Sequence, residues 1–296
     1  MKSNAERGTR NGVTRRTFVQ AMAAAAMTPV PHSAFRLPHS ARIPRIGLQL
    51  YTVRNLMQKD VAGTLAAVAK IGYQEVEFAG FFDKTPADIR AILETNGLAA
   101  PSGHVPFEAI DTGWDQVLDA AHTLGHRYVV VAWIDAKYRP DLDGWKRVAD
   151  KLNQAGAACS RSNLTLAYHN HSYEFVPLGG QVPYDVLLAA TDPALVKLEM
   201  DLFWITFGGQ DPLAYFAKYP DRVPLVHVKD MAPKPRADIV PDSVMRDVGK
   251  GTIDWKRIFA QAQQAGIKHY FVEHDSPGDA LASVKASFDY LKALEF

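Results

Sequence analysis

The chain has 296 residues, a formal net charge of +1 and one cysteine, Cys159. This length is enough for one large α/β domain with a full hydrophobic core, or for two small domains. The near-neutral charge argues against a nucleic-acid-binding surface, which normally carries a basic excess on one face. A single cysteine excludes an intramolecular disulfide and a cysteine-rich zinc site, so Cys159 is expected to be a small apolar helix residue.

The N-terminal segment differs in composition from the rest of the chain. An arginine pair, Arg15-Arg16, precedes a short run rich in alanine and methionine, residues 21–27, and several prolines follow. These are the parts of a signal peptide, and the apolar run is too short to span a bilayer as a helix. The arginine pair resembles a twin-arginine export signal. We therefore expect a signal peptide and linker over residues 1–41, a folded domain over 42–296, and a periplasmic or secreted protein; a disordered basic tail is the alternative.

After residue 42, short apolar runs alternate with amphipathic helix patterns. Thr85 and Pro86, for example, have the residue types of an N-cap and a first helical position, and Gly97 ends that helix. The expected strands are 46–51, 75–78, 98–104, 128–133, 164–167, 196–201, 223–230 and 269–274. The expected helices are 60–71, 85–97, 114–124, 142–160, 183–190, 212–219, 255–265 and 279–294, with a long loop over 231–251.

Eight strand–helix alternations of this length predict a single parallel (β/α)8 TIM barrel. A doubly wound open sheet is the alternative architecture. No glycine-rich phosphate loop follows the first expected strand, so a dinucleotide site would have no anchor. The barrel is therefore the favoured fold.

Side chains that can bind metal or transfer protons follow several of the expected strands. The densest stretch is 164–175, where His169, His171 and Glu174 fall within six residues. Core strands usually end in glycine, asparagine or aspartate turns instead. The other expected strand ends carry Gln49, Tyr51, Glu75, Glu77, His104, Trp133, Glu199, Asp201, His227, Lys229, Asp230, Glu273, His274 and Asp275. Because the active sites of such barrels lie at the C-terminal strand ends, one site built from several strands is expected.

Taken singly, these residues have structural explanations, since Asp201 could cap a turn and Glu273 could pair with Lys268. Together they form a set of carboxylates and imidazoles without thiolates. Such a set suits one catalytic divalent metal ion, with Mn²⁺ preferred over Co²⁺, Fe²⁺, Ni²⁺, Zn²⁺ or Mg²⁺. A metal bound to vicinal substrate oxygens would polarise a carbonyl and stabilise an enediolate, and a nearby carboxylate could move the proton.

Several of these segments resemble the sugar phosphate isomerase/epimerase family, part of the xylose isomerase-like barrel superfamily. The segments that carry the resemblance are 47–54, 168–175, 198–201 with Trp204, 227–230, 248–255 and 272–275. The resemblance extends from about residue 45 to the C-terminus. It implies one divalent metal held by a glutamate, an aspartate, a histidine and a second glutamate on strands five to eight.

Carried over residue by residue, the resemblance implies Asp201, His227 and Glu273 as metal ligands. The family's first glutamate lies near the position of Tyr168 or His169 here, where this chain has no carboxylate. Glu174 is the predicted substitute, and His169 or His171 is the alternative fourth ligand.

The remaining site residues receive roles from the same comparison. Glu174 and Glu273 are predicted to be catalytic, with His171 a candidate for proton transfer. The predicted substrate-binding residues are Tyr51, His104, His169 and Lys229. An ion pair that orients a metal ligand is the alternative role for Lys229, and Trp133 and Trp204 are either sugar-stacking platforms or core residues.

The leading functional hypothesis is a metal-dependent sugar or keto-sugar isomerase or epimerase that removes a proton next to a carbonyl. A 3-keto-glycoside lyase or hydratase would need the same site. A phosphodiesterase, as in the related AP endonucleases, is less favoured because the charge balance supplies no basic DNA groove. A non-catalytic periplasmic sugar-binding module is the alternative from another class. The expected partner is a small sugar or keto-sugar, with no nucleic acid and no membrane span; the particular sugar and homo-oligomerisation stay open.

Overall fold

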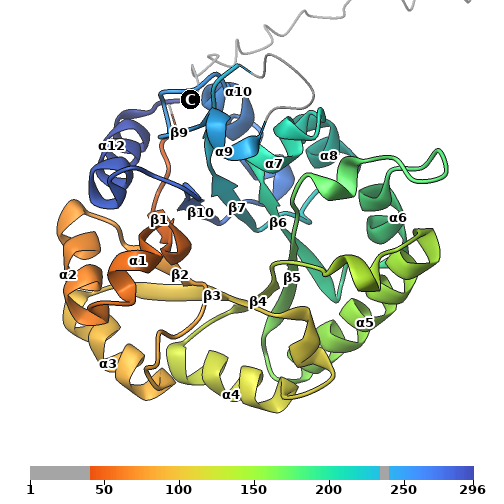
Figure 1. The fold of residues 1–296 in the computed structure, drawn as a ribbon, viewed down its shortest axis with the longest axis horizontal. Coiled ribbons are helices and arrows are strands. Elements are labelled where there is room, and N and C mark those ends of the chain that lie inside the picture. The colour runs from red at the N-terminus through yellow and green to blue at the C-terminus, as the bar shows by residue number, and fades with distance from the viewer. Residues whose placement is uncertain (1–40, 234–239) are drawn as a thin grey trace, which may run out of the picture. The chain divides into compact units, whose positions relative to one another are not determined.

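The computed structural model describes residues 41–233 and 240–296, so all but the last residue of the predicted signal peptide lies outside it. Eight parallel strands close into a barrel surrounded by helices (Figure 1). The strands are β1 (Ile46–Gln49), β2 (Glu75–Phe78), β3 (Ala99–Val105), β4 (Tyr128–Val131), β5 (Thr165–His169), β6 (Val196–Asp201), β7 (Leu225–Val228) and β10 (His269–Val272). The predicted single (β/α)8 TIM barrel is confirmed.

Helices follow the strands and cover the outside of the barrel (Figure 1). They are α1 (Arg54–Met57), α2 (Val61–Ile71), α3 (Pro86–Asn96), α4 (Trp114–Leu124), α5 (Leu142–Arg161), α6 (Pro183–Ala190), α7 (Leu202–Phe207), α8 (Pro212–Lys218), α9 (Pro241–Val244), α10 (Trp255–Phe259), α11 (Ala262–Ala265) and α12 (Ala280–Ala293). The predicted cap of α3 is present, because Thr85 Oγ1 accepts a hydrogen bond from the Asp88 amide and Gly97 takes φ +64°. None of the helices in the described ranges is long and apolar enough to cross a membrane.

The segment after β7 contains more structure than the predicted loop over residues 231–251. Two short antiparallel strands, β8 (Asp230–Met231) and β9 (Met245–Arg246), pair there. The Asp230 carboxylate organises this segment, because it accepts hydrogen bonds from the amides of Met231, Gly249, Gly251 and Ile253 and from the Trp255 indole. The predicted helix 255–265 is also divided, into α10 and α11.

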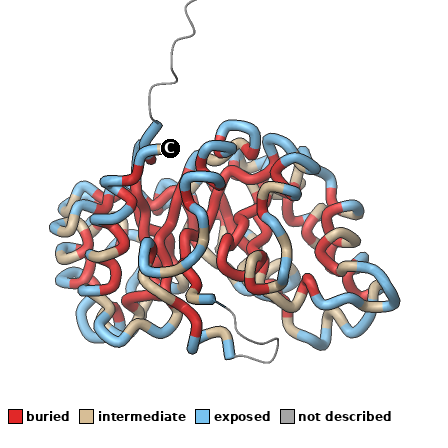
Figure 2. The backbone as a smooth tube through the Cα atoms, turned by 90° about the horizontal axis from the view of Figure 1, so that it is seen from above, coloured by how far each residue is buried: buried red, intermediate tan, exposed pale blue. Residues whose placement is uncertain are grey.

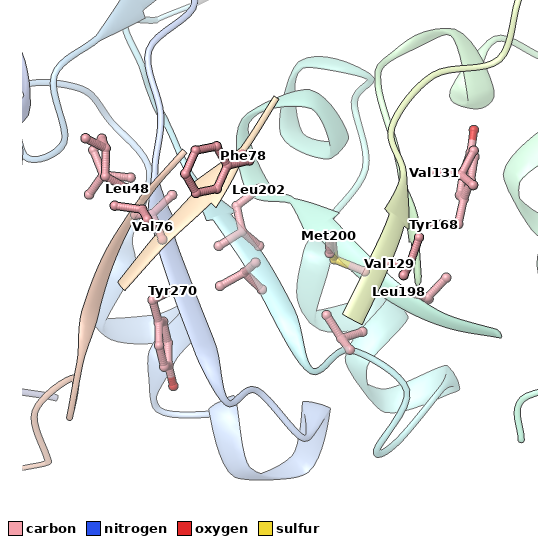
Figure 3. Packing of buried hydrophobic residues seen from close by; sticks show 14 of the residues in the cluster. Leu48, Val76, Phe78, Val129, Val131, Tyr168, Leu198, Met200, Leu202 and Tyr270 are labelled. Atoms are coloured by element: carbon pink, nitrogen blue, oxygen red, sulfur yellow. The ribbon is translucent and has the colours of Figure 1, made fainter. Parts of the chain in front are cut away.

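The hydrophobic core occupies the layer between the strands and the helices. Alternate strand residues such as Val129, Val131 and Tyr168 point into this layer (Figure 3). Figure 2 shows the buried strands at the centre, enclosed by helices whose outer faces are exposed.

The opposite face of the strands lines the inside of the barrel. A separate apolar cluster lies there, made of Tyr128, Val130, Ala167, Leu225 and Phe271. Because side chains two residues further along a strand lie on the same face, His169, His227 and Glu273 form the next layer toward the C-terminal strand ends. The fold therefore places polar groups above an apolar floor.

Candidate metal centre and active site

Three of the four predicted metal ligands lie together at the C-terminal ends of neighbouring strands. Asp201 ends β6, His227 lies in β7, and Glu273 follows β10. Their nearest ligand atoms lie within 4.8 Å of one another. His227 Nδ1 is 2.9 Å from Glu273 Oε2 and 3.8 Å from Asp201 Oδ2. The structure therefore brings Asp201, His227 and Glu273 into one group that can hold a metal ion.

The bonding of Asp201 fits a metal ligand. Its Oδ1 atom accepts a hydrogen bond from the Trp204 amide at 2.8 Å, which fixes the carboxylate. Its Oδ2 atom is buried and accepts no hydrogen bond of good geometry within the described residues, although Lys229 Nζ lies 3.1 Å from it as an ion-pair partner. His169, the last residue of β5, places its Nε2 atom 3.9 Å from this oxygen. Since buried carboxylate oxygens are rarely left unsatisfied, Asp201 Oδ2 with these imidazoles fits a divalent cation.

Both histidines next to Asp201 are oriented by a second carboxylate. His227 Nε2 lies 2.8 Å from Glu77 Oε1, which leaves Nδ1 to face Asp201 and Glu273. His169 Nδ1 lies 3.1 Å from Glu199 Oε2, which leaves Nε2 to face Asp201. Metal-binding histidines usually donate their other ring N–H to a carboxylate in this manner. In both pairs, one ring nitrogen contacts a carboxylate and the other faces Asp201, so His169 is oriented as a metal ligand in the same way as His227.

Glu77 and Glu199 were noted in the sequence only as residues at strand ends, and no role was predicted for them. Both are fully buried inside the barrel. Glu77 also accepts hydrogen bonds from Gln49 and Ser102. The sequence held one indication of the position of Glu199. Side chains alternate along a strand, so Glu199, two residues before Asp201 in β6, lies on the same face as Asp201.

A second group, made of His104, His169, Glu199 and His227, has ligand atoms equally close together. Within it, His104 Nε2 lies between two carboxylates, 3.0 Å from Glu77 Oε1 and 2.8 Å from Glu199 Oε2. Burial opposes protonation, but these carboxylates outweigh it and raise the pKa of His104 to about 9. The group around Asp201 contains two carboxylates and one histidine, whereas this group contains one carboxylate and three histidines, so the charge of a divalent cation is better balanced at Asp201.

Glu174 is not brought together with the other predicted ligands. It lies in the short 3₁₀ turn η4 (Tyr173–Phe175) and belongs to neither metal-competent group. Its carboxylate accepts a hydrogen bond from the Tyr168 hydroxyl at 2.7 Å and from the His171 amide at 3.0 Å. Burial raises the pKa of the Glu174 carboxyl to about 7. The geometry gives Glu174 the position of an anchor for the His171 loop and offers no support for its prediction as a ligand.

Lys229 is buried among carboxylates. Its Nζ atom lies 2.7 Å from Glu273 Oε2, 2.8 Å from Asp275 Oδ1 and 3.1 Å from Asp201 Oδ2. These carboxylates raise the pKa of Lys229 well above its ordinary value even though burial opposes the charge. This is the ion-pair arrangement predicted as the alternative to substrate binding, and it includes Asp275, a strand-end residue for which no role was predicted.

His171 faces the cavity from the loop after β5. Its ring stacks on Tyr173 with centroids 5.6 Å apart, and Trp204 lies 5.4 Å away. Its Nδ1 atom is buried and unpartnered within the described residues. Burial, with a smaller contribution from Lys229, lowers the pKa of His171 to about 3, so the imidazole is neutral.

A cavity of about 590 Å³ opens above the metal group. Its lining includes all four predicted substrate-binding residues and two of the three predicted catalytic ones: Tyr51, His104, His169, Lys229, His171 and Glu273. Trp133 also lines it and is 50% exposed, whereas Trp204 is buried in an apolar cluster with Phe203 and Phe207. We refer to this space as the main cavity.

A closed (β/α)8 barrel with carboxylates and imidazoles gathered at its C-terminal strand ends defines a class of metal-competent barrel proteins. Comparison with known families agrees with that class. Residues 65–294 match the xylose isomerase-like TIM barrel family, and the chain belongs to this family.

Similar proteins include dehydratases and proteins described as isomerases or epimerases. The inosose dehydratase of Lacticaseibacillus casei is 25% identical over 76% of this chain and 84% of its own length. That of Bacillus cereus is 29% identical over 78% of this chain and 87% of its own length. A crystal structure of a sugar phosphate isomerase/epimerase from Parabacteroides distasonis has a TM-score of 0.73 and 26% identity, and the match covers 86% of this chain and 96% of that one.

Proposed function

We propose that this protein is a metal-dependent lyase that removes water, or another leaving group, from a polyhydroxylated ketone. Isomerisation, epimerisation and elimination all begin with removal of a proton next to a carbonyl. The similar inosose dehydratases favour elimination over the predicted isomerase or epimerase activity. The observation that carries the proposal is that Asp201 Oδ2 accepts no hydrogen bond within the described residues and lies between two histidines, each oriented by a carboxylate.

The metal would be held by His169, Asp201, His227 and Glu273. When bound, it supplies Lewis-acid polarisation of the substrate carbonyl. Two imidazoles and two carboxylates suit Mn²⁺, Fe²⁺, Co²⁺, Ni²⁺ or Zn²⁺, and Mn²⁺ remains the first ion to test. Although burial opposes ionisation, Lys229 lowers the pKa of the Glu273 carboxyl and orients both Glu273 and Asp201 through its ion pairs.

The other polar groups of the main cavity divide into a base and an acid. His171 lines the cavity as a neutral imidazole and would take the proton next to the carbonyl. His104, held as an imidazolium between Glu77 and Glu199, would give a proton to the departing oxygen. Tyr51 and Trp133 would bind the substrate at the cavity mouth.

The test uses Mn²⁺-loaded protein in D₂O with a keto-inositol, free ketoses and 3-keto-glucosides, followed by proton NMR. We expect deuterium to enter next to the carbonyl and a leaving group to be released. Replacement Glu273→Gln should keep the fold, seen by circular dichroism, and reduce turnover by about a hundredfold or more. Interconversion of ketoses without elimination would restore the isomerase or epimerase reading, and unchanged turnover by Glu273→Gln would contradict the site.

Binding without exchange on any of these substrates would favour the non-catalytic sugar-binding module. The periplasmic or secreted location remains a proposal based on Arg15-Arg16, which lies outside the described residues. Detection of the mature protein in a periplasmic fraction, and its loss after Arg15→Lys with Arg16→Lys, would test this location.

A further inference from the structure

A second cavity of about 300 Å³ lies beside the main cavity, between β3 and α4. We call it the side cavity. Its lining residues are Gly80, Phe81, Gly103, His104, Val105, Pro106, Gln116, Val117, Ala120, Ala121, His126 and Val129. Four of these, Gly80, His104, Val105 and Pro106, also line the main cavity, so the two cavities share a wall.

The side cavity is apolar except for a few side chains. Its apolar lining includes Phe81, Val105, Val117 and Val129, together with Ala120 of α4. A mostly apolar concave space with a small number of placed polar groups is the usual form of a small-molecule site. The main cavity, with its charged wall, suits a sugar; the side cavity suits an aromatic or aliphatic group attached to it.

His126 gives the side cavity a hydrogen-bond acceptor. Its Nδ1 atom lies 2.6 Å from the Ala100 carbonyl oxygen, so Nδ1 must carry the hydrogen and donate it. The Nε2 atom of a neutral imidazole then has a free lone pair. Burial lowers the pKa of His126, which keeps the ring neutral.

Gly103 keeps the approach to this nitrogen open. A Cβ atom at residue 103 would lie only 2.9 Å from His126 Nε2. The nitrogen accepts no hydrogen bond from another residue of the described chain. His126 Nε2 can therefore accept a hydrogen bond from a ligand hydroxyl.

We propose that the side cavity binds the aglycone of a keto-glycoside, in the form of an aromatic ring that carries a hydroxyl group. This proposal rests on the proposed lyase function and names its substrate class. The sugar ring lies in the main cavity and loses the proton next to its carbonyl to His171. The electron pair of the broken carbon–hydrogen bond forms a carbon–carbon double bond. The bond from the sugar to the aglycone oxygen breaks, and that oxygen takes the proton from His104.

The first experiment measures binding of the aglycone class without turnover. Metal-depleted protein is titrated with 4-fluorophenol and, separately, with 4-fluoroanisole, and fluorine NMR gives each dissociation constant. We expect saturable binding, with 4-fluorophenol tighter by about three- to tenfold because only it can donate to His126. Equal affinities for the two compounds, or no saturable binding, would overturn the proposal.

Two matched variants locate the binding. Ala120→Phe places a ring in the side cavity and should weaken 4-fluorophenol binding by about tenfold or more. His122→Phe adds the same ring at an exposed position of α4 that lines neither cavity and should leave the affinity unchanged. Circular dichroism and Mn²⁺ affinity equal to the wild type would show that Ala120→Phe is folded. Unchanged 4-fluorophenol binding by folded Ala120→Phe would overturn the assignment.

Turnover separates this proposal from the proposed function. Wild-type protein should prefer a 4-hydroxyphenyl 3-keto-glucoside to the methyl 3-keto-glucoside, and Ala120→Phe should lose this preference while retaining turnover of the methyl compound. If the phenol binds as expected but neither compound is turned over, the lyase function fails and the aryl site remains. If both are turned over equally by wild type and Ala120→Phe, the aryl site fails and the lyase function remains.

Discussion

The fourth metal ligand is decided by contacts of single atoms. His169 presents Nε2 toward Asp201 Oδ2, whereas the Glu174 oxygens accept hydrogen bonds from Tyr168 and the His171 amide. Loss of a supporting carboxylate around a metal site typically costs about 10- to 100-fold in affinity, and loss of a ligand should cost at least as much. We therefore expect His169→Ala to weaken Mn²⁺ binding by about a hundredfold, and Glu174→Gln to change it by less than about threefold. Isothermal titration of metal-depleted proteins would measure both, and the opposite ranking would restore Glu174 as the ligand.

The buried Glu174 carboxyl predicts a pH dependence of stability. Its pKa is raised from 4.5 to about 7, so the folded state retains a proton that the unfolded state releases between these values. The stability contributed by this protonation is present below pH 4.5 and is lost as pH rises to about 7. Relative to Glu174→Gln, the metal-depleted wild type should lose up to about 3 kcal/mol of unfolding free energy across this window. Urea unfolding at several pH values would measure it; a constant difference between the two proteins would contradict the raised pKa.

Part of the site could be predicted from residue type and place alone. Asp201, His227 and Glu273 lie directly at strand ends, where the barrel geometry leaves little freedom. Glu174 lies five residues past His169, and the intervening turn directs its carboxylate toward Tyr168 instead of the metal group. Sequence spacing does not determine the direction of such a turn.

Among the elements, the segment after β7 depends on one buried carboxylate. Asp230 accepts four backbone amide hydrogen bonds and one from Trp255, although the sequence predicted only a loop here. In Asp230→Asn, one acceptor oxygen becomes an amide donor that faces other donors. We expect this change to lower the unfolding free energy by about 3 kcal/mol and to expose the segment to proteolysis first.

A surface aspartate provides the control for Asp230. Asp289 pairs with Lys285 on the exposed face of α12. Asp289→Asn should change the unfolding free energy by less than about 1 kcal/mol, because exposed ion pairs contribute little. Equal effects of the two substitutions in denaturant unfolding would show that Asp230 does not organise the segment.

In the whole molecule, the proposed ligands occupy one continuous arc of the barrel. Strands β5, β6, β7 and β10 are consecutive neighbours, and the opposite arc, β2 and β3, contributes no ligand. At a metal concentration about 100 times the dissociation constant, binding should stabilise the ligand-bearing arc by about 2.7 kcal/mol. Hydrogen exchange with and without Mn²⁺ should therefore show greater added protection in β5–β7 and β10 than in β2 and β3. Equal added protection in both arcs would mean that the metal stabilises the barrel as a single unit.

The architecture itself was accessible from the sequence because eight repeats of the same alternation have few alternative folds. The predicted and observed first residues agree for β1, β2, β4, β6 and β10, whereas β3, β5 and β7 begin one or two residues later than predicted. The predicted strands 46–51 and 128–133 continue past the observed β1 and β4, because residues 50–53 form a 3₁₀ helix and residues 132–133 leave the ladder and line the main cavity. The sequence pattern of a strand does not mark where its hydrogen-bonded ladder stops.

Closure of the barrel also sets an order of events during synthesis. β1 is hydrogen-bonded to β10 as well as to β2, and Ala41 exchanges two backbone hydrogen bonds with Phe296. The first strand to leave the ribosome therefore waits for the last one, and until His269–Val272 emerges both β1 and β7 have an open edge. A nascent chain of this topology cannot close its sheet until β10 has left the ribosome, so any chaperone that shields the open edges has to act until then.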